Sequence, residues 1–200
     1  MKTLLQINSS LNSNAGQSSV LTAQFAERWL RANPGGKVIV RDLAANPPAH
    51  LTADRFEAFL TAPEDRTDEQ TAYAAESDEL IRELEAADAV VIGLPMYNFG
   101  IPSTLKAWID HVARAGKTFK YTDKGPVGLL ADRPVWLFAT RGGSYRNTPR
   151  DTQSAYMTHF LNFIGIKNIE FIYAEGLAMG AEARRESLEG AREFIDRLAA

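Results

Sequence analysis

Five short apolar segments alternate along this chain with longer segments of helical periodicity, and this alternation most limits the folds available to it. The apolar segments are candidate strands: Leu4–Ile7, Val38–Val40, Asp88–Leu94, Val135–Ala139 and Ile169–Tyr173. Asp88–Leu94 is the clearest, because a continuous β-branched run is typical of a strand that is buried on both faces. Strand and helix alternating five times predict an α/β domain, in which helices cover both faces of a parallel sheet.

The helices are predicted from the spacing of apolar residues and from residues that begin or end helices. The predicted segments are Val20–Leu30, Thr67–Leu84, Ser103–Ala113, Pro149–Phe163 and Leu188–Leu198. Thr67 and Gln70 have the spacing of a capping box, and Pro149 is expected at the first helical position with Asp151 at the third. Two segments fit this scheme less well: 42–66 is expected to be loop with a short helix, and 115–130 a glycine-punctuated loop.

Composition fits one globular domain, residues 1–200, and sets aside several other classes of protein. Of the 200 residues, 45% are hydrophobic and 24% are charged, which is unlike a disordered chain. The formal net charge of −3 lacks the basic surplus of nucleic-acid binders, and the chain has no cysteine for disulfides or thiol chemistry. His50, His111 and His159 have no metal-ligand spacing. No apolar run approaches the ~18 residues of a membrane span, so we expect a cytoplasmic protein without metal, membrane or nucleic-acid partners.

The segment after the first strand is a candidate anion site. In parallel sheets, ligands bind beyond the carboxyl ends of the strands. Here a serine-rich segment, Ser9–Ser19, leads into a helix. Hydroxyl groups and the free N–H groups of a helix start together suit a phosphate. The alternative is a polar turn in which Ser18 or Ser19 is an ordinary N-cap.

The segments after the third and fourth strands add an aromatic wall and a glycine-lined edge. Pro95–Pro102 places Met96, Tyr97, Asn98 and Phe99 on a loop, which suits a flat apolar ligand or else local packing. Gly142 and Gly143 allow either a close backbone approach to a ligand or a tight turn. A phosphate cradle, an aromatic wall and a glycine edge on one side of a sheet describe a mononucleotide with a flat ring, and FMN matches all three.

These segments resemble the FMN-dependent NADH-azoreductases, a group within the flavodoxin-like NAD(P)H:quinone oxidoreductases, over essentially the whole chain. The matching segments are Ser9-Ser10, Gln17-Ser18, Arg41–Pro47, Pro95–Phe99, Val112–Gly116, Thr118-Phe119, Thr140–Gly143, Phe163–Ile166 and Ala174–Gly176. The resemblance implies a flavodoxin-like doubly wound sheet of five parallel strands in the order 2-1-3-4-5. It also implies FMN bound non-covalently, one per subunit, NADH as electron donor, and a homodimer with flavin sites at the subunit interface.

The resemblance also implies roles for particular residues. Ser10, Gly16, Gln17 and Ser18 are expected to hold the phosphate, and Met96, Tyr97, Asn98 and Phe99 to contact the isoalloxazine. Thr140, Arg141, Gly142 and Gly143 are expected at the pyrimidine edge. Tyr121 and Phe163 are expected to reach the substrate pocket of the partner subunit. The chemistry is expected on FMN, with Asn98 assisting and no side chain acting as a catalytic group.

The resulting hypothesis is an oxidoreductase in which NADH reduces FMN and then quinones or aromatic azo compounds are reduced in turn, by a ping-pong mechanism. The alternatives are a flavodoxin-like electron carrier without small-molecule turnover, and a flavin-free binding module of the same fold. The sequence leaves open the physiological acceptor, the preference between quinone and azo substrates, and the choice between NADH and NADPH, for which Arg55, Arg146 and Arg150 are candidates. It also leaves open the roles of segments 49–66 and 144–150.

Overall fold

A five-stranded parallel sheet forms the centre of the molecule. The computed structural model describes residues 1–197. The strands of the sheet are β1 (Thr3–Asn8), β2 (Lys37–Asp42), β3 (Ala89–Pro95), β6 (Val135–Thr140) and β7 (Ile169–Ala174), in the spatial order β2-β1-β3-β6-β7. Counted within this sheet alone, the order is the expected 2-1-3-4-5, and all four strand pairs are parallel. The carboxyl ends of all five strands therefore lie at one edge of the sheet.

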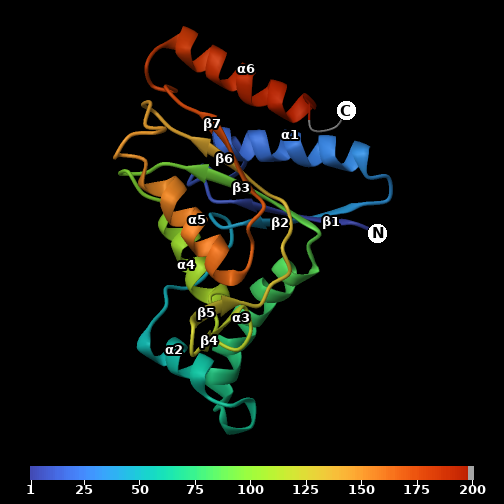
Figure 1. Ribbon diagram of the computed structural model, residues 1–200, viewed down its shortest axis with the longest axis vertical. Coiled ribbons are helices and arrows are strands. Elements are labelled where there is room, and N and C mark those ends of the chain that lie inside the picture. The colour runs from blue at the N-terminus through green and yellow to red at the C-terminus, as the bar shows by residue number, and fades with distance from the viewer. Residues whose placement is uncertain (198–200) are drawn as a thin grey trace.

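Helices cover both faces of the sheet (Figure 1). One face carries α1 (Gln17–Ala32) and α6 (Ala181–Arg197), and the other carries α3 (Asp68–Ala86), α4 (Ser103–Val112) and α5 (Thr152–Ile164). Successive side chains of β3 point to opposite faces of the sheet. Because helices cover both faces, β3 is buried along its whole length. Its residues Val90 and Ile92 pack in the core beneath α3, α4 and α5, whereas Ala89 and Val91 pack in the core beneath α1 and α6.

All five predicted helices are present, but three of them begin elsewhere. Helix α1 begins at Gln17 and not at Val20, and α6 begins at Ala181 and not at Leu188, because the first turns of both helices carry no large apolar residue. The capping box at Thr67 and Gln70 is present. Helix α5, however, begins at Thr152 and not at Pro149, because the Asp151 side chain is the N-cap and accepts a hydrogen bond from the Ser154 N–H. Leu188, Ala191 and Ile195 form the buried side of α6 as expected, and Leu198 lies outside the described residues.

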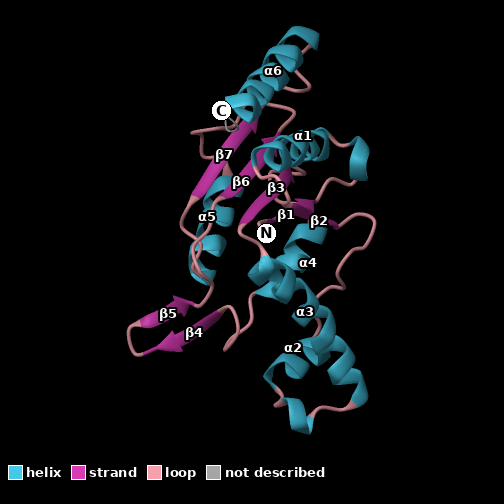
Figure 2. Cartoon of the chain, turned by 90° about the vertical axis from the view of Figure 1, so that its right-hand side faces the viewer, coloured by secondary structure: helices cyan, strands magenta, loops and turns pink. Residues whose placement is uncertain are grey.

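The two less regular segments both contain secondary structure. Segment 42–66 holds the short helix α2 (Ala53–Leu60), as expected, and a single 3₁₀ turn at Pro63–Asp65. The segment expected as a loop at 115–130 instead forms an antiparallel hairpin of β4 (Phe119–Thr122) and β5 (Gly125–Gly128). Figure 2 shows the hairpin and α2 at the end of the molecule farthest from α6. A Cβ on Gly128 would overlap the backbone of Gly165, so this strand packs directly on the end of α5.

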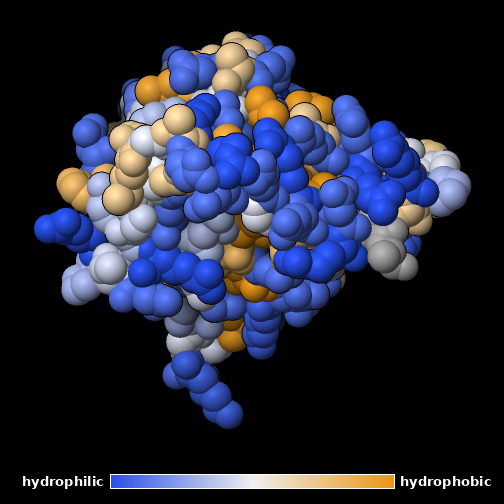
Figure 3. All heavy atoms as spheres, turned by 90° about the horizontal axis from the view of Figure 1, so that it is seen from above, coloured by the Kyte–Doolittle hydropathy of each residue, from blue (hydrophilic) through white to orange (hydrophobic). Residues whose placement is uncertain are grey.

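The outer face over α1 and α6 is mostly hydrophilic, with hydrophobic residues in small areas between polar ones (Figure 3). Among residues 1–197, no helix combines the length and the apolar character needed to cross a membrane.

Candidate functional site

The first loop of the site follows β1 and forms a cradle at the start of α1. Gly16 is the N-cap of α1 and offers no side chain to the helix, so the first N–H groups of the helix are left for another partner. A Cβ at Gly16 would overlap Ser10 Oγ and would lie 2.5 Å from Ser10 Cβ. Ser18 is fully buried, and its Oγ has no hydrogen-bond partner among the described residues. This arrangement suits an anion such as a phosphate, and it rules out Ser18 or Ser19 as the N-cap.

A carboxylate at the end of β2 holds this loop in place. Ser13, which has a positive φ of 47°, donates its hydroxyl hydrogen bond to Asp42 Oδ2. Asp42 Oδ1 accepts from the N–H groups of Ala44 and Ala45 at 2.9 and 3.1 Å. Burial alone would raise the pKa of Asp42, but the hydrogen bonds from Ser13, Ala45 and Ala44 outweigh it and the pKa lies below its ordinary value. Asp42 is therefore an anion that anchors the cradle.

The second loop, after β3, is a tight turn that presents two free backbone donors. The N–H and C=O of Tyr97 pair with those of Gly100 at 3.1 and 2.9 Å, and both residues between them, Asn98 and Phe99, have positive φ, of 50° and 63°. This is the geometry of a type I′ turn, and it is unfavourable for Phe99. The N–H groups of Asn98 and Phe99 bond to no other described residue. The Phe99 side chain is 51% exposed.

The turn is fixed from below by helix α5. The buried Gln153 donates through Nε2 to the carbonyls of Pro95 and Gly100, at 2.8 and 2.9 Å. Thr152 Oγ1 donates to the carbonyl of Phe99. Nothing in the sequence marked Gln153, because its role depends on where α5 packs and its only sequence signal is an amide at the start of a helix.

A single tyrosine joins the first loop to the second. The hydroxyl of Tyr97 accepts a hydrogen bond from the Leu11 N–H at 3.2 Å and lies 3.4 Å from Ser10 Oγ. The predicted phosphate cradle and the predicted aromatic wall are thus in direct contact. The sequence placed them on the same edge of the sheet, and the structure brings them together there.

The third loop, after β6, points its carbonyls toward the segment that follows β7 and leaves two of its N–H groups free. The carbonyls of Arg141, Gly142 and Gly143 accept from the N–H groups of Leu177, Ala178 and Gly176 at 3.1, 2.9 and 3.1 Å. The N–H groups of Gly142 and Gly143 have no hydrogen-bond partner within residues 1–197. Thr140 is buried beside Pro95 in the β3–β6 pairing. Two backbone donors are therefore available at the edge where the sequence predicts the pyrimidine end of a ring.

The side chain of Arg141 does not contribute to this free edge. It is 0% exposed, and its guanidinium pairs with Asp151 at 2.6 Å and with Glu175 at 3.1 Å. It also lies over the Tyr173 ring, 5.1 Å from the ring centroid. The Arg141 side chain therefore lies beneath the third loop as an internal counter-ion. The free donors of the loop are the backbone N–H groups of Gly142 and Gly143.

The ion pair gives Asp151 a defined dependence on pH. Burial by itself would raise the pKa of Asp151, but hydrogen bonds from Arg141 and Ser154 outweigh it, so the pKa lies below its ordinary value. A lowered pKa in the folded state stabilises the fold at pH above the ordinary pKa of about 4, and this contribution is lost as pH falls through the folded-state value. We therefore expect the stability gap between the unaltered protein and Asp151→Asn to be constant from pH 6 to 8 and to shrink below pH 4, by urea denaturation. A gap that widens on acidification would contradict this sign.

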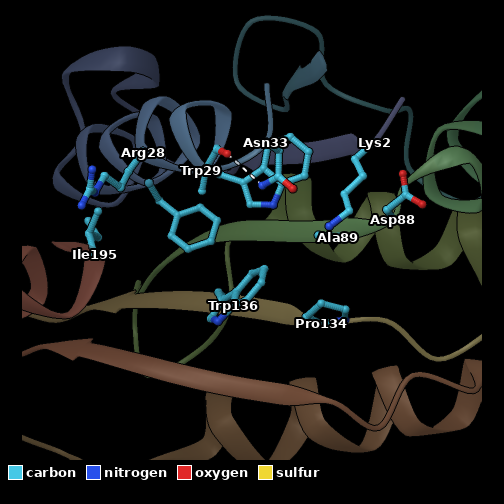
Figure 4. Close-up of a pocket in the computed structure, with 11 residues that line it drawn as sticks. Lys2, Arg28, Trp29, Asn33, Asp88, Ala89, Pro134, Trp136 and Ile195 are labelled. Atoms are coloured by element: carbon cyan, nitrogen blue, oxygen red, sulfur yellow. Dashed lines mark hydrogen bonds between the residues drawn. The ribbon is translucent and has the colours of Figure 1, made fainter. Parts of the chain in front are cut away.

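Two of the cavities lie near opposite edges of the sheet. One, of about 540 Å³, adjoins the turn at Gly100 and runs between α4 and α5 past Lys106 and Tyr156. The other, of about 390 Å³, lies at the amino ends of the strands; Trp29 and Trp136 line it, with Lys2 and Asp88 at one end (Figure 4). The first cavity reaches the site through Gly100 of the second loop, whereas the second cavity is at the opposite edge of the sheet.

Tyr121 and Phe163 lie away from the three loops of their own chain. They flank Phe119, whose ring centroid is 5.5 Å from that of Tyr121 and 4.3 Å from that of Phe163. Thr152 contacts the turn of the second loop, and Phe163 follows eleven residues later, about 16 Å along α5 at 1.5 Å per residue. Tyr121 is 74% exposed. The three loops of this chain therefore do not include Tyr121 or Phe163 in the site that they form.

The fold and the site define a member of a mononucleotide-binding class of α/β proteins. A family described as having a flavodoxin-like fold matches residues 1–198, and the chain belongs to it. The chain is 58% identical over 180 residues to an FMN-dependent NADH:quinone oxidoreductase of Cellvibrio japonicus, covering 90% of each chain. It is 49% identical over 195 residues to FMN-dependent NADH:quinone oxidoreductase 6 of Burkholderia lata, covering 98% of each.

Solved structures agree with these relatives. An azoreductase of Bacillus anthracis strain Sterne superposes with a TM-score of 0.90 at 30% identity, covering 100% of this chain and 99% of that one. An FMN-dependent NADH-azoreductase of Bacillus anthracis strain Ames Ancestor, solved in complex with FMN, gives a TM-score of 0.88 at 26% identity and covers all of both chains.

Proposed function

We propose that this protein is an FMN-dependent oxidoreductase that uses NADH to reduce quinones and to cleave aromatic azo compounds reductively. One observation carries the proposal: three loops at one sheet edge offer a phosphate cradle, an exposed aromatic turn and free backbone donors. The names of the relatives support both activities, since the curated relatives are quinone oxidoreductases and the solved structures azoreductases.

The residues present fit FMN at each part of that group. The unpartnered Ser18 Oγ, Ser10, Gly16 and Gln17 would hold the phosphate at the start of α1. Met96–Phe99 would contact the ring, and the N–H groups of Gly142 and Gly143 would donate to its pyrimidine edge. When bound, FMN supplies two-electron transfer from NADH to an acceptor. The chain's own part is to bind and orient the ring, and its fixed donors favour the negative charge that reduction brings to that edge.

The position of the cavity supports a shared site for donor and acceptor. The cavity of about 540 Å³ adjoins the turn at Asn98 and Phe99, and the sequence contains no Gly-x-Gly-x-x-Gly motif for binding a dinucleotide. NADH and the acceptor would then occupy the same space in turn, which gives ping-pong kinetics. Of the three arginines that are candidates for a 2′-phosphate, Arg55 pairs with Glu76 and Arg146 stacks over Tyr173, which leaves Arg150 as the candidate without a partner among the described side chains.

We also propose that two subunits together complete the site. Tyr121 and Phe163 are displaced from the loops of their own chain, and the cavity between α4 and α5 is open on its outer side. A second copy of the chain would cover this cavity and bring its hairpin to the neighbouring site. Sedimentation equilibrium on the FMN-loaded protein should return twice the mass of one chain, and a monomer at micromolar concentration would contradict the proposal.

Steady-state kinetics test the function directly. Protein loaded with FMN should oxidise NADH in the presence of a benzoquinone or of a simple azo dye such as methyl red. Double-reciprocal plots at several fixed quinone concentrations should be parallel, as a ping-pong mechanism requires. Intersecting lines would overturn the mechanism. NADH consumption that is independent of both acceptors would overturn the substrate assignment.

Asn98 offers a specific test of the aromatic turn. Its side chain supplies both a donor and an acceptor beside the ring site, and its backbone has a positive φ of 50°. Replacing it with glycine keeps that backbone conformation accessible while removing the amide. We expect Asn98→Gly to slow anaerobic reduction by NADH about tenfold, as loss of one hydrogen bond of about 1.5 kcal/mol requires, with Asn98→Ala more severe because alanine also strains the turn. Stopped-flow rates equal to those of the unaltered protein would remove Asn98 from the mechanism.

A further inference from the structure

A carboxylate outside the three predicted loops fixes the third of them. Glu175, directly after β7, uses a single oxygen, Oε1, to accept from the N–H groups of Tyr145 and Arg146 at 2.8 and 2.9 Å. The same oxygen accepts from Arg141 Nη1 at 3.1 Å. Three donors from one loop thus converge on one oxygen of a side chain that is only 15% exposed.

This contact lies next to the free donors of the site. The N–H groups of Gly142 and Gly143 sit between Arg141 and Tyr145, the two ends of the segment that Glu175 holds. The N–H groups of residues 176–178 donate to the carbonyls of residues 141–143. Because the C=O and N–H of a trans peptide point in opposite directions, the N–H groups of Gly142 and Gly143 point away from β7. Side chain and backbone after β7 therefore act together on the orientation of these two donors.

The same contact positions an aromatic side chain against the second loop. Glu175 accepts from the N–H of Tyr145, and the Tyr145 ring packs back over Gly143, where an added Cβ would lie 2.7 Å from the Tyr145 hydroxyl oxygen. The Tyr145 ring also lies edge-on to Phe99, with 5.6 Å between ring centroids. The second and third loops are thus joined through Tyr145, whose backbone N–H donates to Glu175.

We propose that Glu175 is the positioning residue that orients the Gly142–Gly143 donors and the Tyr145–Phe99 pair toward the flavin. This assignment rests on the proposed function, since it concerns the same cofactor site. Glu175 itself does not touch the flavin; it acts through the loop. Without the Glu175 carboxylate, the N–H groups of Tyr145 and Arg146 lose their hydrogen-bond partner, and the third loop can adopt several conformations.

The chain offers a matched control at the other end of the same strand. Asp132 Oδ1 accepts from the N–H groups of Lys167 and Asn168 at 2.8 and 3.0 Å, just before β7 begins. Asp132→Ala therefore removes the same pair of backbone N–H contacts as Glu175→Ala, without the ion pair to Arg141, at the sheet edge away from the site. Glu175→Gln is the conservative variant, because its amide oxygen can still accept from Tyr145 and Arg146, and Oε2, which the amide nitrogen would replace, bonds to no described residue.

The experiment is an FMN titration of each apoprotein, followed by flavin fluorescence and by the visible circular dichroism of the bound ring. Glu175→Ala should raise the dissociation constant for FMN at least tenfold and alter the visible dichroism. Glu175→Gln should bind within about threefold of the unaltered protein, and Asp132→Ala should bind unchanged.

Tight binding by Glu175→Ala with an unaltered dichroic spectrum would overturn the assignment while the proposed function stands. Equal losses in Glu175→Ala and Asp132→Ala would also overturn it, because the effect would then be general destabilisation. Failure of the unaltered apoprotein to bind FMN would instead overturn the proposed function and this assignment with it.

Discussion

Gly16→Ala should raise the dissociation constant for FMN about a hundredfold, equivalent to about 2.7 kcal/mol of binding free energy. The added Cβ would overlap Ser10 Oγ and approach Ser10 Cβ to 2.5 Å, so the loop after β1 must move. Moving it breaks the alignment of the hydroxyls and the first N–H groups of α1 with the phosphate. Hydrogen bonds to a charged group are worth about 1.5–3 kcal/mol each, so the loss of one or two accounts for this size.

Two further variants show whether the cause is local. Gly190 in α6 has open space where a Cβ would stand, so Gly190→Ala should leave FMN binding unchanged. Adding Ser10→Gly to Gly16→Ala removes both overlapping atoms, so the double variant should bind FMN more tightly than Gly16→Ala but, having lost the Ser10 hydroxyl, less tightly than the unaltered protein. Fluorescence titration of the apoproteins measures all three. A Gly16→Ala protein that binds FMN as tightly as the unaltered one would show that the phosphate does not lie in this cradle.

Arg141→Ala should lower the free energy of unfolding by about 3–5 kcal/mol, the cost of leaving buried carboxylates without their partner. Asp151 and Glu175 both pair with this guanidinium, and their side chains are only 8% and 15% exposed. Removing the arginine leaves two largely desolvated negative charges facing each other across the space it filled. Urea denaturation followed by circular dichroism at pH 7 measures the effect.

Arg185→Ala is the matched control for this prediction. Arg185 also pairs with two carboxylates, Glu182 and Glu189, but all three side chains are at least half exposed. Exposed pairs are worth about 0–1 kcal/mol, so this variant should unfold almost as the unaltered protein does. Arg141→Lys should recover only part of the loss, because an ammonium lacks the planar fork that reaches both partners. Equal effects at Arg141 and Arg185 would contradict the structural role given to Arg141.

The sheet was predictable because its pattern is strong. The central strands β1, β3 and β6 are buried along almost their whole length, so their apolar runs are continuous. The edge strands β2 and β7 are more exposed, but their β-branched and aromatic residues still marked them, and all five strands were predicted to within one or two residues at each end. The hairpin was missed for the opposite reason. Its second strand, Gly125–Gly128, consists largely of residues that are rare in strands, and it exists because it packs on the end of α5.

The candidate site was predictable as a set of loops but not as a set of contacts. The parallel arrangement alone places the segments after β1, β3 and β6 at one edge, and the structure confirms that they meet there. The residues that fix them, Asp42, Gln153 and Glu175, come from other elements. Their roles depend on the packing distance between segments far apart in sequence, which composition and periodicity do not contain. For Arg141 the sequence indicates the place but not the direction of the side chain. The segment Thr140–Gly143 placed it at the site, whereas its guanidinium points inward and pairs with Asp151.

An anaerobic titration of the FMN-loaded protein with NADH shows whether the bound flavin passes electrons from NADH to an acceptor. One equivalent of NADH should bleach the visible flavin band, and one equivalent of a quinone should restore it. A flavin band that persists under excess NADH would contradict the reductase and favour an electron carrier. Protein that retains no FMN after loading would contradict both the reductase and the electron carrier, and only the flavodoxin-like fold would remain established.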